Sequence, residues 1–125
     1  MTENYLTHVE HELMEILWRI GEGTVRDVME HLPSNRNLAY TSVSTILRIL
    51  QQKNILTVKK IGRQHIYVPT LTQTLFTTQS VKKIVKQVFS GNSVNLVAHL
   101  VNQHSLSNDE INAIQQLLDE KKRNS

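Results

Sequence analysis

The feature that most constrains this sequence is a change of hydrophobic periodicity between residues 38 and 69. The segment LAYTSVSTILRILQQKNIL places apolar side chains at the three- and four-residue spacing of one helix face. These side chains are Val43, Ile46, Leu47 and Leu50. The next runs, ILTVKKI and HIYVP, are rich in β-branched residues and are joined by GRQ, which predicts a two-stranded hairpin with Gly62 in its turn. The region is therefore predicted to fold as a helix that leads directly into a hairpin.

Two shorter helices are expected before this segment. Thr7 and Glu10 have the spacing of a capping box, and an apolar stripe follows them to about residue 20. Thr24 and Asp27 repeat the capping pattern and open a second helix, which we expect to run through Leu32. Three short helices followed by a hairpin are the layout of a winged helix-turn-helix, in which the third helix enters the DNA major groove and the wing contacts the flanking backbone.

The polar side chains of the third predicted helix gather on a face roughly 100° or more from its apolar stripe. This face carries hydroxyl groups, a phenol and a guanidinium but no acid, and such groups hydrogen-bond phosphates and base edges. Taken alone, the face is also explained by an ordinary solvated helix surface. The candidate DNA-binding residues are Tyr40, Thr41, Ser44, Thr45 and Arg48 on the helix, and Lys59, Lys60 and Arg63 on the hairpin.

Charge is unevenly distributed along the chain. The net charge is only +3, but no Asp or Glu occurs between His31 and Asn108. The basic residues in that span are Arg36, Arg48, Lys53, Lys59, Lys60, Arg63, Lys82, Lys83 and Lys86. A long stretch of one sign of charge indicates a polyanionic partner, although a solvated basic surface would explain it equally well.

Residues 71–125 contain three further amphipathic segments. Their candidate buried residues are Leu71, Leu75, Val81, Ile84, Val85, Val88 and Phe89 in the first, Val94, Val97, Leu100 and Val101 in the second, and Ile111, Ile114, Leu117 and Leu118 in the third. One small module cannot bury so much apolar surface, so we expect a partner surface, most simply a second copy of the chain. We predict a mostly α-helical fold with a small β-hairpin, made of a winged-helix DNA-binding domain (residues 1–70) and a helical dimerisation domain (residues 71–125).

Several function classes are disfavoured by composition. The chain has no cysteine, which excludes disulfide frameworks and thiolate sites and is typical of a cytoplasmic protein. Its apolar runs are shorter than the roughly 20 residues that span a bilayer, so we expect no membrane insertion. Because it has no phosphate-binding glycine loop and no carboxylate beside a candidate nucleophile, we predict neither enzymatic activity nor a cofactor. His8, His11 and Glu12 could bind a metal ion, but exposed polar residues on a first helix explain them as well, and we predict no metal site.

The sequence resembles the penicillinase repressor family, the group that contains the BlaI, MecI and CopY winged-helix repressors. The resemblance runs over nearly the whole chain and is carried by HELMEILWRIGEGTVRDVMEHLP, AYTSVSTIL, GRQHIYVP, VFSGN and LSNDEINAIQQLLDE. It implies a cytoplasmic homodimer that binds a two-fold operator in double-stranded DNA and represses the adjacent genes. It also implies that the recognition helix and the wing make the contacts.

The chain departs from the family pattern at three places. Ile49 stands where the family often has Arg, and Asn54 stands where Gly is common, although Asn still tolerates a left-handed backbone. Some members are inactivated by cleavage of an Asn–Phe bond, and the aligned pair here is His99–Leu100, which argues against cleavage at that bond. The cysteine cluster of the copper-responsive branch is absent, which excludes copper sensing by that route.

A winged helix that binds protein, as a subunit of a larger assembly, is the alternative to a DNA-binding repressor. Such a module would more often have acidic or exposed apolar residues on its third helix. The polar face predicted here has neither, and DNA is therefore the favoured partner.

Overall fold

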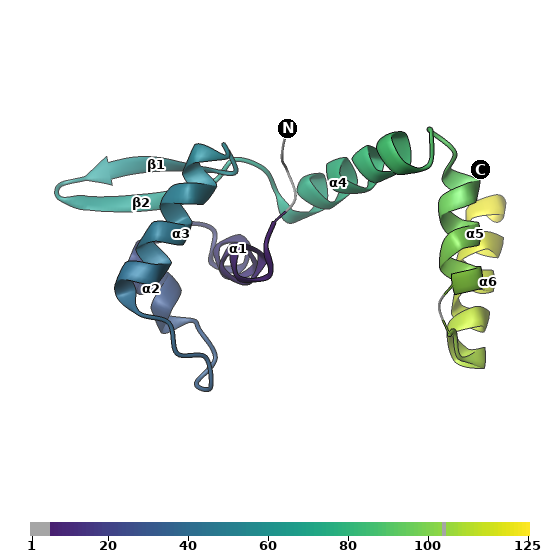
Figure 1. Ribbon diagram of the computed structural model, residues 1–125, viewed down its shortest axis with the longest axis horizontal. Helices are drawn as coiled ribbons and strands as arrows, with labels where there is room; N and C mark the ends of the chain where they lie inside the picture. Colours follow the sequence, from purple (N-terminus) through teal and green to yellow (C-terminus); the bar gives the residue numbers. More distant parts are fainter. Residues whose placement is uncertain (1–5, 104) are drawn as a thin grey trace. The chain divides into compact units, whose positions relative to one another are not determined.

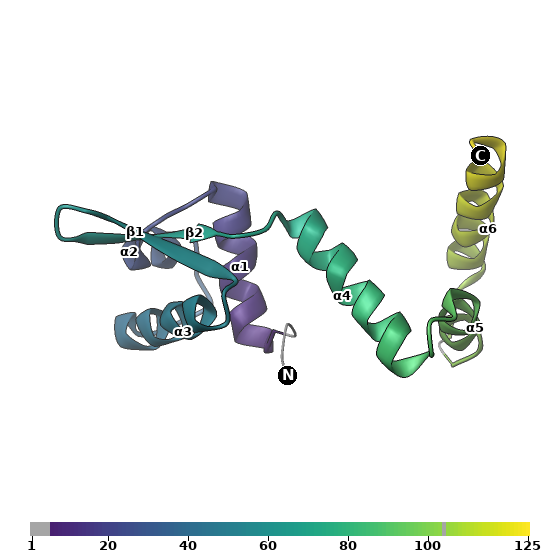
Figure 2. The same ribbon diagram turned by 90° about the horizontal axis from the view of Figure 1, so that it is seen from above.

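The computed structural model describes residues 6–103 and 105–125 of the chain, which divides into two compact units, Met1–Val81 and Lys82–Ser125. The first unit contains α1 (His8–Ile20), α2 (Val25–Glu30), α3 (Tyr40–Gln52), β1 (Leu56–Ile61) and β2 (Gln64–Pro69) (Figure 1). Helix α4 (Gln73–Val88) begins in the first unit and ends in the second, which also contains α5 (Ser93–Gln103) and α6 (Asn108–Arg123) (Figure 2). The predicted mostly helical fold, with three helices followed by an antiparallel hairpin, is confirmed.

Both capping boxes predicted for the first unit form. The Thr7 hydroxyl accepts a hydrogen bond from the Glu10 N–H at 3.1 Å, and the Glu10 carboxylate accepts one from the Thr7 N–H at 2.9 Å. Thr24 and Asp27 make the same pair of bonds at 3.1 and 2.9 Å. Each box satisfies two backbone N–H groups that a helix start leaves without a partner, so the local sequence sets where α1 and α2 begin.

Helix α2 ends at Glu30, and the prediction that it runs through Leu32 is wrong. The reason is local. Pro33 follows Leu32, and a proline ring disfavours the helical conformation of the residue before it. The His31 N–H bonds instead to the Val28 carbonyl at 3.1 Å, which closes the last turn of the helix tightly.

Helix α3 turns its apolar face into the core, as predicted. Val43, Leu47 and Leu50 are fully buried, and Ile46 is half-buried against them. The core is completed by Leu13, Met14, Ile16 and Leu17 of α1, by Val25 and Val28 of α2, and by Ile55, Leu56 and Tyr67 of the hairpin region. Because interiors are packed to crystal-like density, this interlocking fixes the rotation of α3 about its own axis.

The hairpin closes with a two-residue loop, Gly62 and Arg63, after the last paired residues Ile61 and Gln64. Gly62 has φ +62°, and a positive φ at the first loop residue alone is typical of the type II′ turn that suits strand twist. Gln64, which the sequence placed in the turn, is therefore the first residue of β2.

The hairpin is attached to the helices through both of its strands. Gly23, before α2, exchanges two backbone hydrogen bonds with Tyr67 of β2 at 2.8 and 3.0 Å. A Cβ at position 23 would lie 3.0 Å from atoms of both Ile20 and Asp27, so only glycine fits this crossing without displacing a neighbour. On the first strand, the chain passes from α3 into β1 through Asn54, whose φ is +64°, which confirms that Asn supplies the left-handed backbone at this position.

The start of α4 belongs to the winged-helix unit. The Trp18 indole N–H donates to the Leu71 carbonyl at 2.9 Å, and the Trp18 and Phe76 rings lie 5.5 Å apart. Phe76 is half-buried against the core of α1–α3. Part of the connection after the hairpin is therefore held by α1.

The helices of the second unit expose their apolar faces in the single chain. No described residue of α4, α5 or α6 is buried, so none of the candidate buried positions in these helices is fully covered. Five candidates in residues 71–125 are half-buried: Leu71, Ile84, Val85, Phe89 and Ile114. The large exposed residues there are Leu75, Val81, Val88, Val94, Val97, Leu100, Val101, Ile111, Leu117 and Leu118. The helices themselves are locally specified, because Ser107 and Glu110 form the predicted capping box of α6 at 2.9 and 3.1 Å.

A charged pair joins α1 to the end of α3. Glu10 is only 5% exposed, and its two carboxylate oxygens accept hydrogen bonds from the Lys53 ammonium at 2.7 and 3.0 Å. Burial raises the pKa of Glu10. The hydrogen bonds from Lys53 and from the Thr7 N–H lower the pKa by more than burial raises it, so the pKa lies below its ordinary value. The carboxylate is therefore stabilised in the folded state.

Replacing Glu10 with Gln should lower the free energy of unfolding at pH 7 by about 1–3 kcal/mol, because Lys53 loses its charged partner. The pKa of Glu10 is depressed by folding, so its contribution is present above the pKa of the unfolded chain and is lost as pH falls through the folded value. Urea midpoints measured from pH 7 to pH 3 should therefore fall more steeply for the wild type than for Glu10→Gln. The exposed Glu30→Gln variant should keep the wild-type slope, and parallel curves for all three proteins would contradict the prediction.

Candidate nucleic-acid interface

The polar face of α3 lies at the surface because the opposite face is locked in the core. Tyr40 is 46% exposed. Thr41, Thr45 and Arg48 are also exposed, and Ser44 is half-buried. All five helix residues predicted to bind DNA are thus accessible on one side of α3, which offers hydroxyl donors and acceptors and one guanidinium.

A groove separates the start of α3 from the hairpin. Tyr40 and Ser44 line it from α3, and Arg63 and His65 line it from the hairpin, around a volume of about 350 Å³. Thr41 and Thr45 border a different, shallower hollow on the other flank of the helix, together with Ser42 and Ile46. The structure therefore brings Tyr40, Ser44 and Arg63 together and sets Thr41 and Thr45 apart from them, while Arg48 borders neither hollow.

The two predicted wing lysines lie on opposite faces of the hairpin. Side chains alternate along a strand, so Lys60 shares the face of Val58, and Lys59 points to the other side. Val58 pairs with the buried Tyr67. The hairpin face that carries Lys60 is therefore the face that packs on the core nearer the base of the hairpin. The Lys59 ammonium instead lies 3.0 Å from the carboxylate of Glu22, before α2. Only Lys60 is thus placed on the same face as the groove-lining His65, its cross-strand partner.

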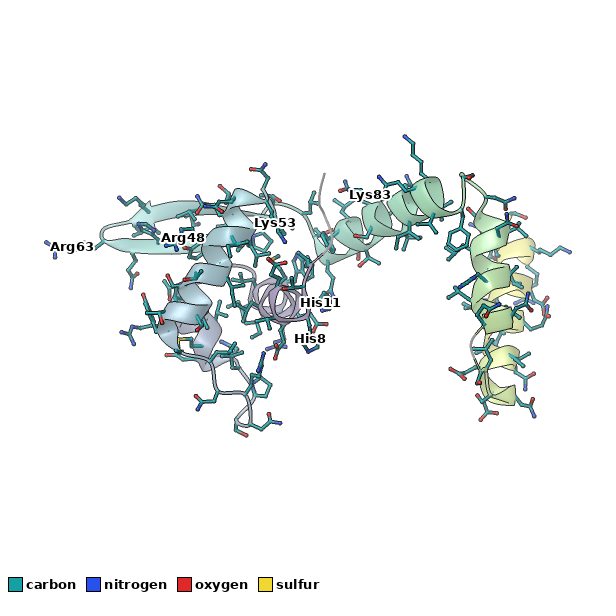
Figure 3. All side chains as sticks on the ribbon, viewed as in Figure 1. His8, His11, Arg48, Lys53, Arg63 and Lys83 are labelled. Atoms are coloured by element: carbon teal, nitrogen blue, oxygen red, sulfur yellow. The ribbon has the colours of Figure 1, made fainter. Side chains whose placement is uncertain are left out.

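Acids from the N-terminal segment neutralise part of the acid-free span. Besides Lys53 and Lys59, Arg36 is paired, and its Nε donates to both carboxylate oxygens of Glu12 at 2.9 and 3.2 Å. Within residues 6–81, the bases of the span that have no acidic partner are Arg48, Lys60 and Arg63. Figure 3 shows Arg63 at the tip of the hairpin and Arg48 on α3. The unpaired bases of the span within residues 6–81 thus lie on α3 and on the hairpin.

One candidate interface residue was missed by the sequence. The guanidinium of Arg26, on α2, lies 5.2 Å from the centroid of the Tyr40 ring, and Arg26 lines the groove beside it. Arg26 stands between acidic residues in the sequence and before the acid-free span. The distribution of charge along the sequence therefore gave no reason to select it. The cation–π contact with Tyr40, which is distant in sequence, is the signal that identifies it.

The histidines of α1 do not gather into a metal site in the described part of the chain, where no group of three or more His, Asp or Glu side chains could hold a metal ion. His8 and His11 both lie on α1 (Figure 3). Glu12, the third member considered, is bonded to Arg36, and the His11 ring lies 6.4 Å from Trp18. Among the same residues, no helix is both long and apolar enough to cross a membrane.

Several known proteins similar to this chain are named as repressors or transcriptional regulators. The sequence profile of the penicillinase repressor family matches residues 6–120. The penicillinase repressor of Bacillus licheniformis is 23% identical over 94% of this chain and 91% of its own length, and the transcriptional regulator BlaI of Mycobacterium tuberculosis is 42% identical over 51% of this chain and 47% of its own length. The solved structure of Bordetella bronchiseptica BpsR, 16% identical, superposes with a TM-score of 0.51 over 98% of this chain and 83% of that one, which shows similarity of fold alone. With a match that covers nearly all of its length, the chain belongs to the penicillinase repressor family, a family of DNA-binding transcriptional repressors.

Proposed function

We propose that the chain represses transcription as a cytoplasmic homodimer bound to a two-fold operator in double-stranded DNA. The observation that carries the proposal is the exposed polar face of α3 next to a groove whose lining contains no carboxylate. In this proposal Thr41, Ser44 and Thr45 meet base edges in the major groove, because residues early in a recognition helix point most directly at the bases. Arg48, two turns along α3, reaches a guanine or a phosphate.

The wing supplies affinity without sequence choice in this proposal. Lys60 and Arg63 neutralise backbone phosphates, because a hairpin tip is poorly shaped to read bases. Tyr40, the first residue of α3, contacts the DNA beside the wing. Lys59 contributes less, since it is already paired with Glu22 at 3.0 Å and reaches a phosphate only by giving up that carboxylate.

Dimerisation through residues 71–125 is supported by their exposed apolar side chains. Val94 is 75% exposed, Val88 is 67% exposed and Leu117 is 65% exposed, and soluble monomers rarely expose contiguous apolar patches of more than a few hundred Å². A second copy covers such faces in an isologous interface, which also matches the symmetry of a two-fold operator. Residues 1–70 then form the DNA-binding domain and residues 71–125 the dimerisation domain.

A protein-binding winged helix is the competing function. Its third helix would more often present acids or apolar residues to a partner. The exposed residues of α3 include Tyr40, three hydroxyl-bearing residues and Arg48, with Ile49 as the one large aliphatic residue at the border of exposure. Relatives named as repressors favour DNA as the partner and binding without catalysis as the activity.

Replacing Thr45 with Ala should lower the ratio of specific to non-specific DNA affinity by about 1–3 kcal/mol per disturbed base contact. Its melting temperature should stay near that of the wild type, because Thr45 is exposed. Leu47→Ala, on the buried face of the same helix, should instead destabilise the protein by about 2–5 kcal/mol. Both variants are measured by melting and by binding to a duplex that the wild type selects from random DNA. Early melting of Thr45→Ala, or undiminished selectivity, would show that α3 does not read the bases as proposed.

Lys60→Ala should weaken specific and non-specific binding alike and should reduce the log–log salt slope by roughly 0.9, the loss of about one phosphate contact. Lys59→Ala is the matched control, because it removes the same charge from the other face of the same strand. It should change the slope less. If the two variants change the slope equally, the two faces of the wing do not differ in DNA contact.

A fragment that ends at Val81, the limit of the first compact unit, should be folded and monomeric, whereas the full chain should sediment as a dimer. This end point retains the packing of Phe76 on Trp18, which a cut at residue 70 would remove. A fragment that dimerises as tightly as the full chain would place the interface in the winged helix instead.

A further inference from the structure

The groove between the helices and the hairpin has more positive charge than α3 and the wing supply by themselves. Arg26 lines it from α2, and Arg63 and His65 line it from the hairpin. The polar lining also includes the hydroxyl-bearing Thr24, Tyr40 and Ser44 and the amide-bearing Gln64, and no Asp or Glu contributes to it. A concave surface of guanidinium and hydroxyl donors without a carboxylate suits an anion.

Arg26 is kept available for such an anion. The acid that follows it, Asp27, is occupied by the capping box and accepts a hydrogen bond from the Thr24 N–H at 2.9 Å. Glu30, one turn further along α2, is exposed, and within the described residues it forms no ion pair with Arg26. The guanidinium of Arg26 is therefore not neutralised by a neighbouring carboxylate.

The Tyr40 ring orients this guanidinium. With the guanidinium carbon over the ring and 5.2 Å from its centroid, the contact is a cation–π interaction. A cation–π contact uses none of the five guanidinium N–H donors as a hydrogen bond, so they stay available for a bidentate contact with a phosphate. A side chain held in advance also loses less conformational entropy when it binds.

We propose that Arg26 and Tyr40 form a two-residue phosphate-binding unit, in which Tyr40 positions Arg26 and Arg26 binds a backbone phosphate of the operator from the α2 side of the groove. The ligand is a DNA phosphodiester and not a base edge, because Arg26 is on the first helix of the helix-turn-helix, which crosses the backbone while α3 enters the major groove. This inference rests on the proposed DNA-binding function and adds a contact to it that the acid-free span does not contain.

The test measures binding to a selected duplex and to a random duplex over a range of salt concentrations. Arg26→Ala should reduce the log–log salt slope by roughly 0.9 on both duplexes, and Arg26→Lys should retain most of the slope because the positive charge remains. Arg19→Ala is the matched control. It removes the same charge from an exposed residue of α1 that does not line the groove, and it should leave the slope unchanged.

The role of Tyr40 is tested by combining variants. In a Tyr40→Leu background, which lacks the ring, Arg26→Ala should change the slope by clearly less than it does in the wild type. Tyr40→Phe, which keeps the ring, should restore the full effect. Additive effects of Arg26→Ala and Tyr40→Leu would overturn the positioning role, because two independent contacts would then account for them.

The outcomes separate this inference from the proposed function. If Arg26→Ala and Arg19→Ala give the same salt slope while Lys60→Ala reduces it, the phosphate-binding unit is wrong and the DNA-binding function stands. If the wild type selects no duplex from random DNA and its affinity does not depend on salt, both proposals fail. Melting temperatures near the wild-type value for Arg26→Ala and Arg19→Ala establish that both variants are folded.

Discussion

The burial of one face of α3 is the constraint on which the rest of the winged helix depends. Val43, Leu47 and Leu50 fill the space between α1, α2 and the hairpin and are fully buried. A helix anchored along one stripe cannot rotate without opening cavities, which cost several kcal/mol each. The opposite face, with Thr45 and Arg48, is therefore held outward with no need for contacts of its own, so the core does the positioning and leaves the surface residues open for recognition.

The distribution of unpaired charge in the winged-helix unit depends on which bases the acids of the N-terminal segment contact in the folded chain. Glu10 bonds Lys53, and Glu22 lies 3.0 Å from Lys59, so acids from α1 and from the loop after it neutralise bases that the sequence separates from them by tens of residues. Both pairs also join elements, because one links α1 to the end of α3 and the other links the loop before α2 to β1. Within residues 6–81, these contacts and the Arg36–Glu12 pair leave Arg48, Lys60 and Arg63 as the unpaired bases of the acid-free span. Affinity for the DNA backbone depends on such a local excess more than on net charge.

The second unit shows that a chain can specify helices without specifying what covers them. Capping at Ser107 and Glu110 and the apolar periodicity are local properties, and α6 forms where they predict. Burial of the stripe on each helix depends on another surface, and the single chain leaves Leu117 and Val94 largely exposed. This combination of well-defined helices and uncovered apolar faces is what supports a partner for residues 71–125.

Local rules predicted much of the fold and part of the candidate site. Caps at Thr7 and Thr24, the buried stripe of α3 and the turn at Gly62 all follow from neighbours within a few residues, and even the early end of α2 has a local cause in Pro33 that the sequence contains. Contacts between distant residues could not be read in this way. The separation of Lys59 from Lys60, the pairing of Arg36 and the cation–π contact of Arg26 with Tyr40 depend on which element faces which. By itself, the sequence determined the elements and the faces of each, because helix and strand periodicities repeat within a few residues. Only the tertiary structure decided which charges are neutralised and which side chains share a groove, because ion pairs and ring stacking act through space between residues that periodicity does not relate.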